Sequence, residues 1–344
     1  MPSVTVTPAL HTEVVADLPL PDPAMLREAA GGDATRARHD ALAASIPALH
    51  LVEARQPARS PGEAPQRLRV AAWNLERCTR VEASAALLRR AGASVALLSE
   101  MDLGMARSGN RHTTRDVATA LGMGHVYGVE FVELGHGLGR ELERFSGQIN
   151  HGALHGNGLV SAVPFRDPFV VRLDEGGAWF DLDWHHRRLG GRMAIGATID
   201  LARGPVTLVS VHLENRSTPQ ERGDAIERLI AALPPGAPAV VAGDLNVAAL
   251  PDPVAEPDRA WFDHPDAREP LFAALRRAGF DWLRCNTQDQ TRRLIPDGRP
   301  APAVRRIDWF FTRGVEASLP LTWAAADDAG DPLSDHDMIS VDIT

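Results

Sequence analysis

Carboxylate, carboxamide and imidazole side chains recur at or beside the ends of short apolar runs in this sequence of 344 residues. Each run has the length and composition of a β-strand. Polar groups at strand ends can meet at one rim even when they are distant in sequence. Because the pooled set is rich in oxygen ligands and lacks thiolates, it suits Mg²⁺ or Mn²⁺ better than zinc. In chain order the set is Asn74, Glu76, Glu100, His212, Asp244, Asn246, Asp308, Asp335 and His336.

A divalent cation held by such oxygens would clamp a phosphate group. Hydrolysis of a phosphate ester needs neutralisation of the nonbridging oxygens, an activated water in line and stabilisation of the leaving oxygen. The cation, Asp244 and the histidines would supply these in turn. Asp308 would orient His336 and raise its pKa by opposite charge. Which histidine is the acid, and whether one or two metal ions are used, stays open.

Taken singly, these residues also have ordinary structural interpretations. An Asp or Asn at a strand end is a common turn former or helix cap, so Asp244 and Asn246 alone favour function and turn equally. A lone strand histidine such as His212 is more often partnered inside the sheet. The joint pattern shifts the balance toward a catalytic site.

The elements that would position these residues are mostly strands. Nine strands and about four helices are too strand-rich for a doubly wound parallel fold, and favour two packed, largely antiparallel sheets flanked by helices. The predicted strands span residues 68–74, 95–100, 125–134, 158–163, 192–201, 206–213, 239–245, 306–312 and 338–343. The predicted helices span residues 83–91, 113–121, 219–233 and 270–279.

The first 66 residues differ in composition from the rest of the chain. Their prolines are scattered, and residues 60–65 read as a linker. We therefore expect an N-terminal extension over 1–66 and one catalytic domain over 67–344. Within the extension, Asp22 and Pro23 predict the cap and first turn of a short helix, and 33–51 has helical spacing.

Seven motifs in order make the sequence resemble the endonuclease/exonuclease/phosphatase superfamily. These Mg²⁺-dependent phosphoesterases include DNase I-like nucleases, abasic-site endonucleases, neutral sphingomyelinases and inositol polyphosphate 5-phosphatases. The resemblance covers about 67–344 and implies a four-layer α/β/β/α sandwich, in agreement with the strand count. The motifs are Trp73-Asn74-Leu75, Leu98-Ser99-Glu100, Gly158-Leu159-Val160-Ser161, Ser210-Val211-His212-Leu213, Gly243-Asp244-Leu245-Asn246, Arg306-Ile307-Asp308-Trp309 and Ser334-Asp335-His336.

The resemblance also implies a metal centre. Glu100 matches the principal metal ligand, and Asn74 matches the residue that positions it or binds the metal through water. Asp335 matches a ligand of the same or a second metal position. Glu76 stands where some members carry another acidic residue of the metal site, and we expect it to support the ligands.

Catalytic roles follow in the same way from the resemblance. Asp244 and Asn246 match the pair that orients the attacking water and a phosphate oxygen. His336, with Asp308 behind it, matches an imidazole that contacts the scissile phosphate. His212 matches the other phosphate-facing histidine of the DNase I-like and sphingomyelinase-like branches.

Composition and charge narrow the function further. Hydrophobic residues at 44% and charged residues at 24% are typical of a soluble globular protein. A net charge of −9 argues against binding nucleic acid mainly by neutralising phosphates. All basic residues are arginine, which excludes Walker A, kinase and Schiff-base lysine chemistry. Two cysteines and the absence of a long apolar run predict a cytoplasmic protein with no membrane span. The sequence implies no obligate protein partner.

Three further residues are candidates for substrate binding. Arg107 and Arg111 lie in a locally basic stretch just after Glu100, which would grip a second phosphate. Asn157 precedes the Gly158 motif and would face the phosphate. Residues 179–188 mix aromatics with bases, as a stacking loop or as a hydrophobic cluster under a loop.

The sequence therefore predicts a metal-dependent phosphoesterase that cleaves a phosphodiester, either in nucleic acid or in a small molecule. A phosphomonoesterase acting on a sugar, nucleotide or lipid headgroup is the alternative. A catalytically idle binding module is disfavoured because the constellation has no gap. A serine hydrolase is disfavoured because the sequence lacks a Gly-x-Ser-x-Gly elbow.

Overall fold

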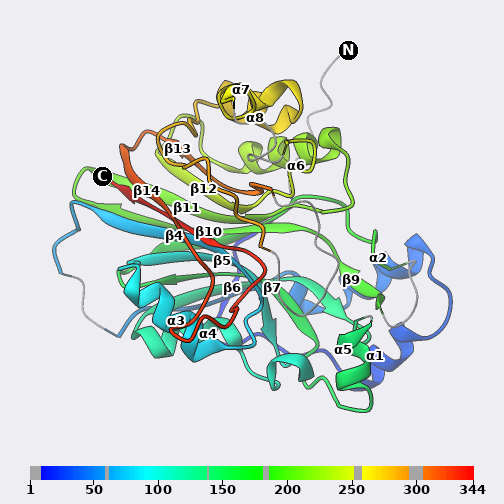
Figure 1. Ribbon diagram of the computed structural model, residues 1–344. Coiled ribbons are helices and arrows are strands. Elements are labelled where there is room, and N and C mark those ends of the chain that lie inside the picture. Colours follow the sequence, from blue (N-terminus) through cyan, green and yellow to red (C-terminus); the bar gives the residue numbers. More distant parts are fainter. Residues whose placement is uncertain (1–8, 59–61, 138, 181–185, 252–257, 294–304) are drawn as a thin grey trace.

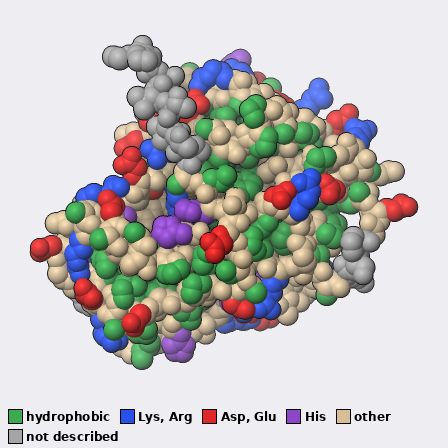
Figure 2. Space-filling model, turned by 180° about the vertical axis from the view of Figure 1, so that it is seen from behind, with side chains coloured by type: hydrophobic (Ala, Val, Ile, Leu, Met, Phe, Trp, Pro, Cys, Tyr) green, Lys and Arg blue, Asp and Glu red, His purple; other side chains and the backbone are tan. Residues whose placement is uncertain are grey.

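The computed structural model describes residues 9–58, 62–137, 139–180, 186–251, 258–293 and 305–344. These residues build two mixed β-sheets that pack face to face, with helices on the outer face of each sheet (Figure 1). The predicted four-layer α/β/β/α sandwich is therefore confirmed. One face of the molecule is hollowed, and histidine side chains gather in that hollow (Figure 2).

The smaller sheet has six strands among the described residues. β11 and β12 run parallel, and the other neighbours run antiparallel. Its spatial order is β1 (Leu10–His11), β8 (Arg166–Arg172), β10 (Met193–Leu201), β11 (Gly204–His212), β12 (Ala239–Asp244) and β13 (Asp308–Arg313). The helices on its outer side are α6 (Pro219–Ala232), α7 (Ala260–Asp263) and α8 (Pro270–Arg277) (Figure 1).

The larger sheet has nine strands in the described part of the chain. In spatial order they are β14 (Ala317–Trp323), β15 (Met338–Ile343), β4 (Leu68–Arg77), β5 (Val95–Leu103), β7 (Leu154–Ser161), β6 (Gly124–Glu133), β3 (Val52–Arg55) and β2 (Val14–Val15), with β9 (Arg188–Gly190) also paired to β6. The helices α3 (Val81–Arg90) and α4 (Thr113–Leu121) cover its outer face (Figure 1). The remaining helices are α1 (Pro23–Ala30), α2 (Arg36–Ala44) and α5 (Arg140–Phe145).

Three apolar layers hold the four structural layers together. Between the sheets, side chains such as Val70 and Leu97 meet Ile195 and Leu208. Two further clusters lie between each sheet and its helices, so the central strands are buried on both faces. Burial on both faces explains why these strands are solidly apolar rather than alternating.

Two parallel strand pairs place the chemistry at one edge. In one sheet β4 runs parallel to β5, and Asn74 lies opposite Ser99, the residue before Glu100. In the other sheet β11 runs parallel to β12, and His212 lies opposite Asp244. Because parallel neighbours end on the same side of a sheet, each pair brings its polar carboxyl ends together.

The N-terminal segment joins both sheets. β1 pairs with β8 of the smaller sheet, whereas β3 pairs with β6 of the larger one and β2 with β3. As predicted, Asp22 caps α1: its side chain accepts the Ala24 N–H at 2.8 Å, and Pro23 occupies the first turn. Residues 10–55 therefore pack on the body of the protein.

The structure adds strands that the apolar pattern did not predict. β8 begins with Arg166, Asp167 and Pro168, and β14 is largely exposed and contains Pro320. Neither has the buried apolar run from which strands were predicted. The four helices predicted for the main domain are present within two residues at each end, whereas the helical spacing over 33–51 corresponds to the shorter α2, Arg36–Ala44.

Candidate active site

The backbone at the ends of β4 and β5 is irregular. The pairing of these strands shifts register between Asn74 and Arg77, and Glu100 has a φ of 57°. Non-glycine residues with positive φ are uncommon, and they concentrate where a side chain must be re-aimed at a functional site. The irregularity takes Glu100 out of the strand alternation and lets its carboxylate reach Asn74.

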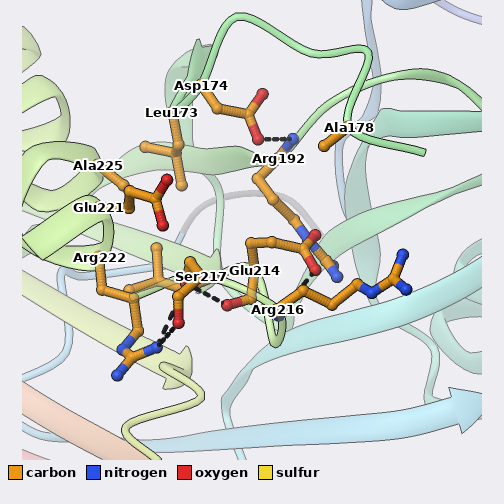
Figure 3. Close-up of a pocket in the computed structure, with 11 residues that line it drawn as sticks. Leu173, Asp174, Ala178, Arg192, Glu214, Arg216, Ser217, Glu221, Arg222 and Ala225 are labelled. Carbon is orange, nitrogen blue, oxygen red and sulfur yellow. Dashed lines mark hydrogen bonds and ion pairs between the residues drawn. The ribbon is translucent and has the colours of Figure 1, made fainter. Parts of the chain in front are cut away.

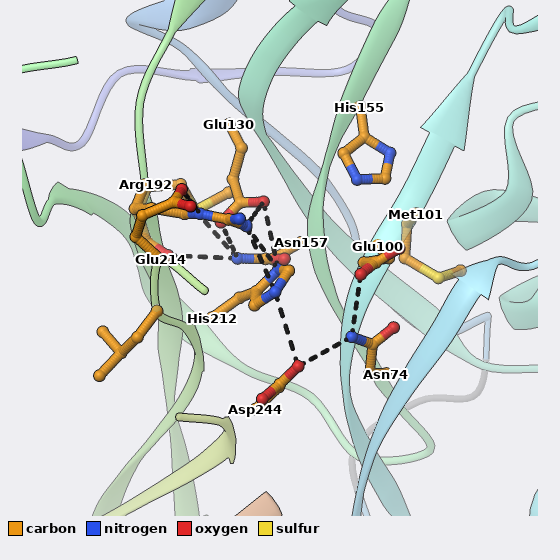
Figure 4. Close-up of polar contacts among 12 residues, drawn as sticks. Asn74, Glu100, Met101, Glu130, His155, Asn157, Arg192, His212, Glu214 and Asp244 are labelled. Atoms are coloured by element: carbon orange, nitrogen blue, oxygen red, sulfur yellow. Dashed lines mark hydrogen bonds and ion pairs between the residues drawn. The ribbon is translucent and has the colours of Figure 1, made fainter. Parts of the chain in front are cut away.

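Asn74 connects the two sheets. Its Nδ2 donates to Glu100 Oε1 at 3.1 Å and to Asp244 Oδ2 at 3.1 Å (Figure 4). Its Oδ1 accepts the N–H of Glu76 at 3.1 Å. Asn74 is 1% exposed, so these contacts fix the amide in a single orientation between the two carboxylates.

The carboxylate of Asp244 is held by the turn that follows β12. Its Oδ1 accepts the N–H of Asn246 at 2.9 Å, and Asn246 adopts a φ of 47°. The Nδ2 of Asn246 donates to the Leu213 carbonyl at 2.8 Å. Asn246 thus forms the turn expected of an Asp-x-Asn sequence and remains beside Asp244.

His336 and Asp308 form a buried pair. His336 Nδ1 lies 2.9 Å from Asp308 Oδ2, and His336 Nε2 lies 3.6 Å from Asp244 Oδ2. Burial by itself lowers the pKa of His336, but the charges of Asp308 and Asp244 outweigh it and raise the pKa to about 9. Asp308 lies opposite Asp244 on β13 and β12, so strand register brings both carboxylates to this imidazole.

The segment that carries Asp335 and His336 is fastened to β4. Ser334 Oγ donates to the Asn74 carbonyl at 2.6 Å, and Trp73 Nε1 donates to the His336 carbonyl at 2.8 Å. The N–H of Asp335 donates to Glu76 Oε2 at 3.1 Å. Glu76 therefore contacts the backbone of the Asp335 segment.

His212 has a carboxylate partner that the sequence did not single out. Its Nδ1 lies 3.4 Å from Glu130 Oε2, and its Nε2 lies 3.7 Å from Asp244 Oδ2 (Figure 4). Arg192 contacts both members of this pair: one of its guanidinium nitrogens lies 3.0 Å from His212 Nδ1 and 3.3 Å from Glu130 Oε2. The signal for Glu130 was a carboxylate inside the buried strand β6, which also carries Glu133.

Two more arginines, both missed by sequence reasoning, contact the proposed metal ligands. Arg77 pairs with Glu100. Arg292 contacts Asp335 Oδ2 at 2.5 Å and His336 Nε2 at 2.6 Å. In a chain with many arginines and no lysine, neither position stands out by residue type.

The donor set fits a divalent cation. Glu100, Asp335 and Asn74 offer only oxygens for coordination, and hard cations prefer oxygen ligands. Both carboxylates already attract a guanidinium, which shows that this part of the site favours positive charge. On the other side, ligand atoms of Asp244, Asp308 and His336 lie within 4.8 Å of one another.

The three predicted substrate-binding residues are placed differently. Asn157 is fully buried, and its Nδ2 donates to Glu130 Oε1 at 3.3 Å, so it belongs to the His212 side of the site. Arg107 pairs with Asp102 through two hydrogen bonds, and it reaches Glu100 only through Glu141 and Arg77.

Arg111 lies outside the candidate active site. Its guanidinium contacts Glu82 at 2.8 Å and Asp116 at 2.5 Å, on the helix side of the larger sheet. No contact of Arg111 within the described ranges involves a residue of the site. The basic stretch that suggested a second phosphate is therefore largely neutralised by its own carboxylates.

A second cluster, which we call the Glu53 cluster, consists of Glu53, His112, Arg115 and His125. Glu53 Oε1 receives His112 Nε2 at 2.8 Å, His125 Nε2 at 3.0 Å and Arg115 at 2.9 Å. His112 Nδ1 accepts the N–H of Arg115 at 3.4 Å, so the ring proton is on Nε2. With that proton and a guanidinium on one oxygen, the cluster is an ion-pair centre rather than a metal site.

The family of the protein follows from comparison with known proteins. The model of the Endonuclease/Exonuclease/phosphatase family matches residues 71–336. The chain therefore belongs to the endonuclease/exonuclease/phosphatase family, as its motifs indicated. Members of this family are in general metal-dependent phosphoesterases and nucleases. No curated protein matches the sequence.

Solved structures agree with this fold. The endonuclease/exonuclease/phosphatase from Beutenbergia cavernae DSM 12333 is similar with a TM-score of 0.57 and 18% identity, over 81% of this chain and 71% of that chain. A functionally unknown conserved protein from Enterococcus faecalis V583 is similar with a TM-score of 0.53 and 14% identity, over 80% of this chain and 99% of that chain. The endonuclease/exonuclease/phosphatase from Bacteroides vulgatus is similar with a TM-score of 0.52 and 16% identity, over 81% of this chain and 98% of that chain. At these identities the likeness concerns the fold alone.

Among the described residues, no helix combines the length and the apolar composition needed to span a lipid bilayer.

Proposed function

We propose that the protein is a divalent-metal-dependent phosphoesterase that hydrolyses a phosphodiester. The observation that carries this proposal is the position of Asn74, whose amide touches Glu100 of one sheet and Asp244 of the other. That contact places a proposed metal ligand beside a proposed water-orienting carboxylate. The His336 and Asp308 pair lies against the same Asp244 carboxylate.

Glu100, Asp335 and Asn74 would hold the cation, which when bound neutralises charge on the phosphate oxygens. Asp244 and Asn246 would orient the attacking water. His336, kept positive by Asp308, would donate to a phosphate oxygen, because a raised pKa favours its protonated form. His212, backed by Glu130, would serve the opposite side of the phosphate.

Arg292 belongs to the same proposal. Its guanidinium lies 2.6 Å from His336 Nε2 and 2.5 Å from Asp335 Oδ2, between the proposed phosphate-contacting imidazole and a proposed metal ligand. A guanidinium is a strong donor to phosphate oxygens, and once His336 is protonated its Nε2–H no longer accepts from Arg292, so both groups would then donate to the phosphate instead of to each other. We therefore assign Arg292 to the phosphate.

Charge supports a compact substrate rather than long duplex DNA. The net charge is −9, and the face in Figure 2 mixes acidic and basic side chains instead of presenting a continuous basic surface. A small phosphodiester is the favoured substrate, and a structure-specific nuclease is compatible with the same site. A phosphomonoester is the second candidate, favoured by Arg292 because an extra donor suits a terminal phosphate.

The test uses protein stripped of metal with EDTA. Hydrolysis of bis-p-nitrophenyl phosphate and p-nitrophenyl phosphate is measured with and without added Mg²⁺ or Mn²⁺. We expect diester cleavage that returns with metal and falls about 100-fold or more in Glu100→Gln and Asp244→Asn, because each removes one charge with little change in volume.

The exposed Asp224→Asn, on α6, is the matched control and is expected to keep full activity. Faster cleavage of the monoester would favour the second candidate. Turnover that is unchanged by EDTA, or by either site variant, would refute the proposal. Thermal unfolding of each variant separates loss of chemistry from loss of fold.

A further inference from the structure

A cavity of about 470 Å³ lies between the carboxyl end of β11 and the start of α6 (Figure 3). This volume is typical of a small-molecule site. Its walls come from the ends of β8 and β11, the residue before β10 and the first two turns of α6. The lining residues are Leu173, Asp174, Ala178, Arg192, Leu213, Glu214, Arg216, Ser217, Glu221, Arg222 and Ala225.

The cavity shares a wall with the candidate active site. Leu213 directly follows His212, its N–H donates to the Asp244 carbonyl at 2.9 Å, and its own carbonyl accepts Asn246 Nδ2 at 2.8 Å. Arg192 contacts His212 on one side and Glu214 Oε2, at 2.9 Å, on the other. A group bound in the cavity is thus one side chain away from the proposed phosphate position.

The charged groups of the wall largely satisfy one another. Arg192 pairs with Glu214, and Arg222 pairs with Glu269 and donates to the Ser217 carbonyl. Asp174 accepts the N–H of Gly176 at 2.8 Å and that of Arg192 at 3.1 Å. Few hydrogen-bonding groups remain for a ligand.

Four lining side chains are apolar, namely Leu173, Ala178, Leu213 and Ala225, and the Glu221 carboxylate is engaged by the N–H and hydroxyl of Thr218. A sugar would bury hydroxyl groups here without partners, at a cost of about 1 to 3 kcal/mol for each unsatisfied group. An aromatic or aliphatic group would leave no polar atom unsatisfied, and its transfer from water to the apolar surface of the cavity is favourable. The lining therefore selects an apolar occupant.

Arg216 lies beside the aromatic part of the wall. Its guanidinium lies over the ring of Trp179, 5.0 Å from the ring centroid, and Trp179 Nε1 donates to Glu214 at 2.8 Å. The lining as a whole carries three arginines and three carboxylates. Because these charges balance, the cavity does not itself attract the phosphate, which stays at the proposed position beyond Arg192.

We propose that this cavity binds the aromatic or similarly apolar organic group that is esterified to the substrate phosphate. The proposal rests on the proposed function and names its substrate class: phosphate esters with an aryl-sized apolar group, rather than sugar phosphates. Arg192 and Glu214 form the partition between that group and the phosphate.

The experiment compares the binding of phenylphosphonate and methylphosphonate by calorimetry in the presence of Mg²⁺. Neither probe has a hydrolysable ester bond, so binding is measured independently of turnover. We expect phenylphosphonate to bind at least about tenfold more tightly, because its ring leaves water for the cavity. Ala225→Leu, which adds bulk to the cavity wall, should reduce this ratio to about one.

Ala231→Leu is the matched control, because Ala231 is an exposed residue of the same helix, and it should keep the ratio. Equal binding of the two probes to the unmodified protein, or an unchanged ratio in Ala225→Leu, would overturn the cavity proposal. Methylphosphonate binding together with bis-p-nitrophenyl phosphate turnover reports on the proposed function alone. Failure to bind either probe, together with no metal-dependent turnover of bis-p-nitrophenyl phosphate, would refute both proposals.

Discussion

Asp244 lies next to both imidazole–carboxylate pairs of the site, which are His336 with Asp308 and His212 with Glu130. Its Oδ2 lies 3.6 Å from His336 Nε2, 3.7 Å from His212 Nε2 and 3.1 Å from Asn74 Nδ2. Asn74 donates a hydrogen bond to it, and both imidazoles lie at ion-pair distance. A carboxylate surrounded in this way is fixed in direction, which suits a group that must aim a water molecule.

The Arg292 assignment can be tested by comparing it with its neighbour. Arg292→Ala should reduce kcat/KM for bis-p-nitrophenyl phosphate by about 10²-fold, because it removes a donor from the phosphate position. Arg293→Ala is the control: Arg293 pairs with Asp337 at 3.1 Å and donates to the Ala325 carbonyl, but has no contact with His336 in the described structure.

A specific rescue would separate contact with the phosphate from a structural role. Added guanidinium ion should restore part of the Arg292→Ala activity, since it can fill the vacated space. Equal losses in both variants, or no rescue at any guanidinium concentration below the unfolding range, would contradict the assignment.

Sequence reasoning predicted much of the residue group and missed its arginines. Asn74, Glu100, Asp244, Asp308 and His336 were expected together, and the structure brings them within one chain of contacts. Arg77, Arg192 and Arg292 carried no signal, because arginine is this protein's sole basic residue type apart from histidine. Their roles depend on long side chains that reach across strands, which local spacing does not encode.

At the scale of elements, parallel pairing assembles the site. β4 with β5 and β11 with β12 are the parallel pairs next to it. Sequence patterns located these strands because they are buried on both faces and apolar. They did not locate β8, which begins with Arg166, Asp167 and Pro168, or the edge strand β14, which is largely exposed, because neither strand has that pattern.

The Glu53 cluster fastens the strand β3 to α4 and β6, and it predicts a dependence of stability on pH. Burial alone would raise the pKa of Glu53, but hydrogen bonds from His112, His125 and Arg115 lower it. A lowered pKa contributes stability above the unfolded value of about 4.3, and this contribution is lost as pH falls toward the folded value.

Glu53→Gln should therefore lower the free energy of unfolding at pH 7 by about 1 to 3 kcal/mol, the range for hydrogen bonds to a charged group. The difference from the unmodified protein should shrink as the pH is lowered below about 4. Urea unfolding at several pH values measures both effects. Glu13→Gln, an exposed position on the same segment, is the control. A difference that stays constant with pH would contradict this account.

At the scale of the whole molecule, residues 10–55 form part of both sheets. The segment supplies β1, β2 and β3 and the carboxylate of the Glu53 cluster. Its scattered prolines distinguished it from the rest of the chain, but composition does not report which strands will pair. The first helix was predicted from its Asp22 and Pro23 cap and the second from helical spacing, whereas strands of two residues carry no periodicity.

Deleting residues 1–66 is expected to lower the melting temperature by several degrees or more, because it removes strand pairs from both sheets and Glu53, the carboxylate of the Glu53 cluster. Differential scanning calorimetry of the shortened and full chains measures this. Deletion of residues 1–8, which precede β1, is the control. An unchanged melting temperature and unchanged kinetics after removal of 1–66 would show that the segment is dispensable.

β1 and β2 also occupy one outer edge of each sheet. An open edge presents unpaired N–H and C=O groups that can recruit a strand from another molecule. With the segment gone, the backbone of β8 would offer such a template at Val170 and Val171, the positions that now pair with β1. In the full chain the segment would therefore prevent self-association by covering this edge. The apparent molecular mass from light scattering should rise with protein concentration for the shortened chain and stay constant for the full chain.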